Sequence, residues 1–378
     1  MRFGTRSIHF GQHDLPYPHP VTEPIYQTST FEWASLDSPP EHQYTRYTNP
    51  NRSTIEGVLA SLENGRRCTC FSSGMAAIVS AFSLLKSGDH LLIAKDIYGG
   101  TSVFANEYLP RQGIEVSEFD SMVAGSLTAQ ARPNTKMAVF ETPTNPNLRI
   151  ADIAAITAEA RKLNVITLFD NTFASPYCQN PLDLGADIVM HSTTKYINGH
   201  SDVIGGAIIT RDEAFGDAIY HYAKVAGGTP SPFDSWLLLR GVKTLALRMR
   251  QHCANAQAIA EFLFTHPKVV AVHYPGLPMH PDHQLARRQM SAFGGMMAFE
   301  YKGTGEEARR LFEKAEIFRI APSLGGVDSL IGYPPAMSHA AMTEAQRLER
   351  GIPPTLLRLS TGIEDTEDLI DDLDRVLA

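Results

Sequence analysis

The chain has 378 residues, of which 43% are hydrophobic and 20% are charged, a composition typical of a globular protein with a large core. Its formal net charge is −8 without a long basic run, which argues against nucleic acid or a membrane as partner and favours small amino-acid-sized substrates. The spacing of Cys68, Cys70, Cys178 and Cys253 fits neither a disulfide framework nor a metal site, so we expect a cytoplasmic protein without a bound metal.

The first segment, residues 1–50, is rich in Pro, His and Tyr and shows little periodicity. We therefore expect an extended arm rather than part of a domain core. Its first residues contain no apolar signal core, and the apolar stretch at 75–85 is too short to span a bilayer. An arm of this kind needs a surface on which to lie.

From residue 51 to about 240, helical patterns alternate with short apolar runs. This rhythm predicts an α/β domain with a mostly parallel sheet, in which functional loops gather at the carboxyl ends of the strands. The expected strands are 90–94, 136–141, 165–170, 187–192 and 205–210.

The last third of the chain has a different pattern. We expect a helix, a break and a long helix, followed by two strands and a closing helix, in the segments 236–267, 269–276, 294–301 and 365–378. The chain therefore divides into an α/β domain at 51–243 and a smaller α+β domain at 244–378.

Polar side chains follow three of the expected strands. Glu141 and Asn145 follow one, Asp170 ends the next, and a third is followed by "HSTTK", which ends in Lys195. Pyridoxal phosphate (PLP) needs such a pair, because a lysine forms a Schiff base with its aldehyde and a carboxylate keeps its ring nitrogen protonated. Lys195 and Asp170 would provide both groups.

Each of these residues also has an ordinary structural explanation. Lys195 alone fits a solvated turn, and Asp170 alone fits a helix cap. Ser73 and Gly74 open an apolar helix whose free N–H groups would hold a phosphate, although a serine there is also a common N-cap. Tyr98 follows a strand and would stack on a cofactor ring, although a single tyrosine more often packs in a core.

A series of motifs in a fixed order carries a more specific resemblance over essentially the whole chain. They are IYQTSTF (25–31), YTRYTNP (44–50), FSSGMAA (71–77), YGGT (98–101), ETPTNP (141–146), FDNTF (169–173), HSTTKYINGHSD (191–202), SLGGVDSLI (323–331) and LLRLSTGIED (356–365). The sequence resembles the fold-type I PLP-dependent enzymes of cysteine and methionine metabolism, the trans-sulfuration family. This resemblance implies an α/β fold with a large, mostly parallel seven-stranded sheet in a PLP-binding domain, a smaller α+β C-terminal domain and an N-terminal arm.

The resemblance also implies roles for individual residues. Lys195 would be the Schiff-base lysine and the catalytic base, Asp170 would pair with the ring nitrogen, and Tyr98 would stack on the ring and act in proton transfer. The cofactor phosphate would be held by Ser73, Gly74, Met75, Ser192 and Thr194.

The resemblance assigns other residues to the substrate and to the neighbouring subunit. By the resemblance, Arg358 would bind the α-carboxylate of the substrate, with help from Ser323 and Asn145. Tyr44 and Arg46 would reach the phosphate of the cofactor in the neighbouring subunit. An active dimer is then the minimal unit, and a homotetramer of two such dimers is expected.

Three positions distinguish between members of the family. Gly100 stands where methionine γ-lyases commonly carry cysteine, and Pro322 and Gln43 stand where relatives that bind cystathionine usually or often carry acids. We therefore expect cystathionine γ-synthase-type γ-replacement of an O-activated homoserine with a thiol such as cysteine. Cystathionine γ-lyase is the main alternative; methionine γ-lyase, cystathionine β-lyase and a non-catalytic PLP-binding regulator rank lower.

Overall fold

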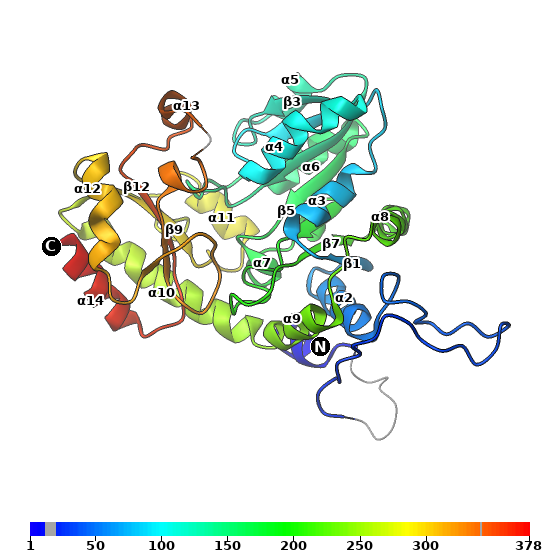
Figure 1. The fold of residues 1–378 in the computed structure, drawn as a ribbon. Coiled ribbons are helices and arrows are strands. Elements are labelled where there is room, and N and C mark those ends of the chain that lie inside the picture. Colours follow the sequence, from blue (N-terminus) through cyan, green and yellow to red (C-terminus); the bar gives the residue numbers. More distant parts are fainter. Residues whose placement is uncertain (12–19, 341) are drawn as a thin grey trace.

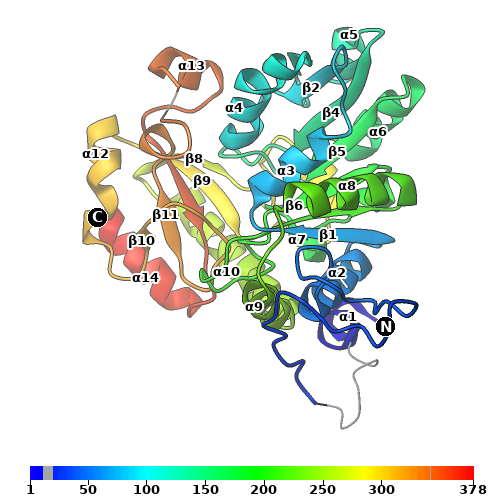
Figure 2. The ribbon, with the colours of Figure 1, turned by 45° about the vertical axis from the view of Figure 1, so that its right-hand side comes forward.

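Two β-sheets form the centre of the protein, and helices pack around each of them (Figures 1 and 2). The computed structural model describes residues 1–11, 20–340 and 342–378. The seven-stranded sheet has the order β1-β7-β6-β5-β4-β2-β3, and the five-stranded sheet has the order β10-β11-β12-β9-β8.

The seven-stranded sheet is mostly parallel, and β7 is the exception. Strand β7 is antiparallel to both of its neighbours, so the expected parallel rhythm is broken at this strand. Strands β1 and β3 were not expected, because polar residues interrupt their apolar ones. The strands are β1 Arg67–Phe71, β2 His90–Ala94, β3 Glu115–Phe119, β4 Thr135–Glu141, β5 Ile166–Asp170, β6 Ile188–His191 and β7 Gly206–Thr210.

Helices cover both faces of this sheet, because successive side chains on its central strands point to opposite sides. On β4, Ala138 and Phe140 pack in one cluster with α2 and α6, whereas Val139 packs in the other with α3, α4 and α8. The helices around this sheet are α2 Pro50–Leu62, α3 Gly74–Phe82, α4 Gly99–Glu107, α5 Ser126–Gln130, α6 Ile153–Lys162, α7 Ser175–Cys178, α8 Glu213–Ala226 and α9 Pro232–Val242.

The long helix α10 leads from the large sheet to the smaller one. The expected break lies between α9 and α10, at residues 243–244, which is also the position of the expected domain boundary. Helix α10 packs together with α12 and α14 against the five-stranded sheet. The elements here are α10 Leu245–Thr265, β8 Val269–His273, α11 His283–Gln289, β9 Met296–Tyr301, α12 Gly305–Arg310, β10 Arg319–Ile320, β11 Leu330–Gly332, α13 Glu344–Glu349, β12 Leu356–Ser360 and α14 Thr366–Leu377.

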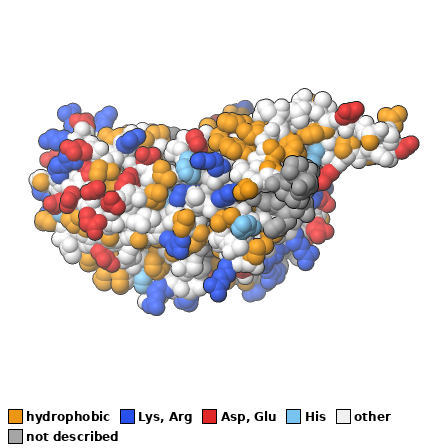
Figure 3. All heavy atoms as spheres, turned by 90° about the horizontal axis from the view of Figure 1, so that it is seen from below, with side chains coloured by type: hydrophobic (Ala, Val, Ile, Leu, Met, Phe, Trp, Pro, Cys, Tyr) orange, Lys and Arg blue, Asp and Glu red, His pale blue; other side chains and the backbone are white. Residues whose placement is uncertain are grey.

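The N-terminal arm is only partly extended. Its first residues form a short helix, α1 Phe3–His9, which packs against α2 and α10, and the ring of Phe3 lies 5.5 Å from that of Tyr177. From residue 20 to 49 the chain has little regular structure, and Figure 3 shows this part of the arm projecting from the body of the protein. Pro50 then starts α2, with Asn49 as its N-cap.

Candidate active site

A cavity of about 600 Å³ lies where the carboxyl ends of β4, β5 and β6 face the five-stranded sheet. Both parts of the chain supply its walls. The predicted residues that line it are Ser73, Gly74, Met75, Tyr98, Asn145, Asp170, Ser192, Thr194, Lys195, Ser323 and Arg358.

Lys195 follows β6 and extends into this cavity. Its Nζ donates a hydrogen bond to Oγ of Ser323 at 2.7 Å. Burial and the nearby charge of Arg358 lower the pKa of its ammonium to about 8, although the Asp170 carboxylate acts in the opposite direction. A larger fraction of the amine is therefore neutral near pH 7 than for an exposed lysine, which favours its action as a nucleophile or a base.

Asp170 is the last residue of β5 and also lines the cavity. Its Oδ1 accepts a hydrogen bond from the backbone N–H of Thr172 at 2.9 Å. Burial raises the pKa of this carboxyl, whereas the hydrogen bonds from Thr172 and the charges of His191 and Lys195 act against that rise. The strand end thus provides a half-buried carboxylate whose charge is partly compensated and which is suited to hold a cationic N–H group.

The N-terminus of α3 borders the cavity beside the loop that follows β6. The first N–H groups of a helix have no partner within the helix and are available for an anion. The side chain of Ser73 caps this helix by accepting from the N–H of Ala76 at 3.0 Å. A Cβ atom at Gly74 would lie 3.0 Å from Cβ of Ser192, so a larger residue would narrow the cavity there.

Arg358 comes from β12 of the second sheet and is 7% exposed. Its guanidinium donates to Oδ1 of Asn145 at 2.9 Å and to the carbonyl oxygen of Ser323 at 3.0 Å. Burial lowers its pKa to about 10, which leaves it charged at neutral pH. Ser323 has φ of 93°, a conformation unusual for a residue other than glycine, and the surrounding contacts hold it there.

Tyr98 and Asn145 share an acceptor that the sequence did not single out for this purpose. The buried carboxylate of Glu141 accepts the backbone N–H of Tyr98 at 2.9 Å and that of Asn145 at 3.3 Å. Burial and the charge of Asp170 raise the pKa of Glu141, while the two N–H donors act against the rise. Glu141 therefore ties together two loops that border the cavity.

Tyr44 and Arg46 do not line this cavity within the single chain. They lie in a shallow depression near the end of α8, where Arg46 donates to the carbonyl oxygen of Lys224 at 2.5 Å. Tyr44 is 40% exposed. Their predicted role toward a neighbouring subunit stays a prediction.

Thr172 is a cavity residue that we did not predict. Its hydroxyl accepts from the N–H of Ser192 at 2.8 Å and so links the ends of β5 and β6. Its position two residues after Asp170, in the motif FDNTF, was the available signal. The apolar lining was also missed, because Ile204 and Met337 lie outside helices and strands, and Pro334 begins a 3-10 helix that is too short to show a periodicity.

Comparison with known proteins identifies the family. Residues 4–378 match the family described as Cys/Met metabolism PLP-dependent enzyme. The chain belongs to this family. A cystathionine β-lyase of Lactococcus lactis is 46% identical over 374 residues, with 99% of this chain and 98% of the relative covered. A cystathionine γ-lyase of Bacillus subtilis is 43% identical over 377 residues, with 100% and 99% covered.

The fold agrees with that of a solved relative. The crystal structure of a cystathionine γ-synthase from Xanthomonas oryzae pv. oryzae, in complex with aminoacrylate and cysteine, superposes on this chain with a TM-score of 0.97. The two sequences are 43% identical, and the match covers 100% of this chain and 98% of that chain. The protein is therefore a PLP-dependent trans-sulfuration enzyme with the fold expected from its sequence.

The residues of the cavity fit PLP. The lysine, the strand-end carboxylate and the helix N-terminus match its aldehyde, ring nitrogen and phosphate in chemical type. Because Gly74 has no side chain, the space between the start of α3 and Ser192 stays open, and a Cβ atom there would fill it.

No helix within the described residues is long and apolar enough to cross a membrane.

Proposed function

We propose that the enzyme catalyses γ-replacement, in which a thiol such as cysteine displaces the oxygen substituent of an O-activated homoserine. The supporting observation is the charge of the cavity lining. Among the described residues, its only acids are Glu141 and Asp170, and Glu141 accepts two backbone N–H groups. As a first substrate, cystathionine brings a distal ammonium that needs a polar acceptor, whereas an O-activated homoserine has no such group. The cysteine that reacts second carries the same ammonium, so the lining bears on the choice of the first substrate.

PLP, when bound, supplies an electron-withdrawing ring that stabilises negative charge on substrate carbon atoms. We propose that Asp170 holds the proton on the ring nitrogen and that the N–H groups at the start of α3 bind the phosphate. The amine of Lys195 takes the proton from Cα, and the hydroxyl of Tyr98 assists a later proton transfer. Arg358 binds the α-carboxylate, which orients the Cα–H bond toward Lys195.

Gly100 supports this choice over methionine γ-lyase chemistry. A Cβ atom at position 100 would lie 2.6 Å from Cε1 of Tyr98 and 2.9 Å from Sδ of Met75. A cysteine there would require both side chains to move. Pro322 lines the cavity without offering a charge, in agreement with a first substrate, the O-activated homoserine, that has no distal ammonium.

Cystathionine γ-lyase activity is the second candidate, because the relative from Bacillus subtilis carries that name and matches the whole chain. The test is to incubate the enzyme with cysteine and O-succinyl-, O-acetyl- or O-phosphohomoserine, and separately with cystathionine. We expect net formation of cystathionine in the first reaction. Cleavage of cystathionine to cysteine and 2-oxobutanoate without any replacement product would favour the γ-lyase. Dominant formation of pyruvate and homocysteine would instead favour a β-lyase and contradict the proposal.

We also propose that the arm completes the active site of a second subunit, in a cytoplasmic homotetramer built from two such dimers. The arm projects from the body of the protein (Figure 3). It exposes hydrophobic side chains, with Trp33 at 40% and Leu36 at 91% exposed. These side chains would be buried against a partner. Tyr44 and Arg46 lie on the same arm, outside the cavity of their own chain.

Mixing subunits tests the shared site. Arg46→Ala and Lys195→Ala should each inactivate the enzyme, but a hybrid dimer contains one site in which both residues are intact. Random subunit exchange should then restore about a quarter of wild-type activity, since half of the dimers are hybrids with one of two sites intact. Mixing two separate preparations of Lys195→Ala is the control. Absence of recovery, with exchange shown by native mass spectrometry, would contradict the shared site.

A further inference from the structure

Glu63 is a buried carboxylate that belongs to none of the cavity walls. It follows α2 as its C-cap and is 1% exposed. Its Oε1 lies 2.5 Å from Nε2 of His191, which is also 1% exposed, and accepts from Nδ2 of Asn171 at 2.7 Å. Its Oε2 accepts from Nδ2 of Asn180 at 3.2 Å. A carboxylate out of water is costly unless it is paired, and these donors compensate it.

The partners of Glu63 lie next to cavity residues in the sequence. Asn171 directly follows Asp170 at the end of β5, and His191 directly precedes Ser192 at the end of β6. Because successive side chains of a strand point to opposite faces, Asn171 and His191 face α2 while Asp170 and Ser192 face the cavity. Glu63 thus connects the ends of β5 and β6 on the face of the sheet that is covered by α2, opposite to the cavity.

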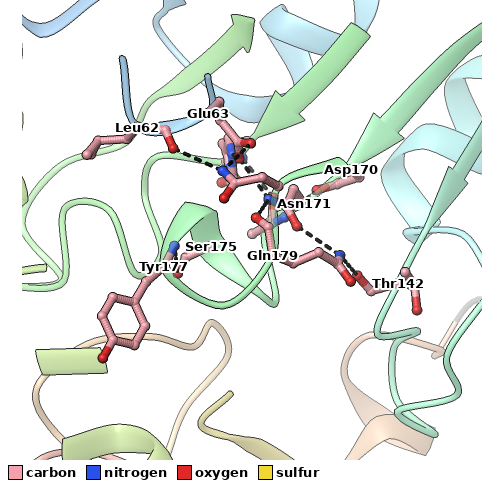
Figure 4. Close-up of polar contacts among 12 residues, drawn as sticks. Leu62, Glu63, Thr142, Asp170, Asn171, Ser175, Tyr177 and Gln179 are labelled. Carbon is pink, nitrogen blue, oxygen red and sulfur yellow. Dashed lines mark hydrogen bonds and ion pairs between the residues drawn. The ribbon is translucent and has the colours of Figure 1, made fainter. Parts of the chain in front are cut away.

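The same network reaches a third strand end. Nε2 of Gln179 donates to Oδ1 of Asn171 at 3.1 Å and to the carbonyl oxygen of Thr142 at 3.3 Å, and Thr142 follows β4 (Figure 4). Nδ2 of Asn171 donates in turn to the carbonyl oxygen of Gln179 at 2.9 Å. The hydrogen bonds therefore run across the carboxyl ends of β4, β5 and β6.

We propose that Glu63 is a positioning residue of the PLP site, which holds Asp170 and Ser192 in place through Asn171 and His191. This inference rests on the proposed roles of Asp170 and Ser192 toward the cofactor. Charge adds to the effect of geometry. The electrostatic effect of His191, which Glu63 holds in place, lowers the pKa of the Asp170 carboxyl and so acts against the rise that burial causes.

The test compares Glu63→Gln with Asp372→Asn. Asp372 is a matched control, since it is a buried carboxylate, 2% exposed, that accepts the N–H groups of Glu316, Ile317 and Phe318 and does not line the cavity. The apo forms of both variants and of the wild type are titrated with PLP, and the visible circular dichroism of bound PLP is recorded at saturation. Thermal unfolding of the apo proteins measures the loss of stability.

We expect Glu63→Gln to weaken PLP binding about 10-fold and to change the visible circular dichroism of bound PLP. A loss of this size is typical when a residue that hydrogen-bonds to a metal ligand is removed, and Glu63 acts in the same indirect way. Asp372→Asn should lower the unfolding temperature but leave both cofactor signals unchanged. PLP affinity of Glu63→Gln within about twofold of wild type, or an equal loss in Asp372→Asn, would overturn the role of Glu63. Failure of the wild type itself to bind PLP would instead overturn the proposed function.

A second pair of variants covers the case in which Glu63→Gln does not fold. Asn171→Ser removes one donor to Glu63 and leaves the contact with His191, whereas His191→Asn removes that contact. Both should weaken PLP binding, His191→Asn more strongly. Unchanged PLP affinity in both variants would contradict the proposal.

Discussion

Replacing Lys195 by alanine is expected to lower turnover by about 10⁴-fold or more, because in the proposed mechanism one amine serves as both the attachment point for PLP and the base at Cα. No second amine lines the cavity among the described residues. The visible absorption that lysine-bound PLP gives, near roughly 420 nm, should also disappear. Steady-state assays and an absorption spectrum of the purified protein measure both effects.

Two controls separate the amine from its charge. Lys195→Arg keeps a cation in the cavity but offers no amine of comparable pKa, so we expect it to be inactive as well. Lys162→Ala removes an exposed lysine at the end of α6 and should leave both signals unchanged. A Lys195→Ala protein with near-normal turnover and an unchanged spectrum would show that another residue carries the reaction.

Arg358→Ala is expected to raise the KM for an amino-acid substrate by about 100-fold, since charge-assisted hydrogen bonds to a buried carboxylate are among the strongest in proteins. The internal partners of Arg358, Asn145 and Ser323, would also lose a donor. PLP binding should be retained, because Arg358 approaches the cavity from the second sheet. KM, kcat and the absorption spectrum are measured together.

The matched variant is Arg358→Lys, which keeps a positive charge but loses the planar pair of N–H donors. We expect a KM between those of the wild type and Arg358→Ala. If kcat/KM is unchanged in Arg358→Ala, the residue does not bind the α-carboxylate. If instead PLP is lost together with activity, its role is structural.

The strands that the sequence predicted best are those buried on both faces. Strands β2, β4, β5, β6 and β7 coincide with the expected strands within one residue at each end, because a short apolar run bounded by polar residues is typical of a strand covered on both sides. Strand β3 lies at the edge of the sheet and is buried mainly at its last residue, so its sequence contains polar residues and no apolar run that would predict a strand. Periodicity alone could not recover such an edge strand.

The candidate site was predictable where parallel strands brought it together. Asp170 ends β5 and Lys195 follows the neighbouring strand β6, so their proximity could be expected from the topology. Glu63 and His191 are 128 residues apart, and nothing in the local sequence relates them. The contact depends on how α2 packs against the sheet, which sequence patterns do not specify.

The antiparallel direction of β7 has a consequence for insertions and deletions. A parallel strand would have required a long crossover after β6, whereas β7 returns directly and closes the loop 192–205. Hydrogen bonds between Thr194 and Gly205 fix the base of that loop. A change in its length would move the amine of Lys195 relative to Asp170. Over evolution, changes of substrate should therefore accumulate at residues 333–338 on the opposite wall, because this segment follows β11 and its length can vary without altering the register of β11.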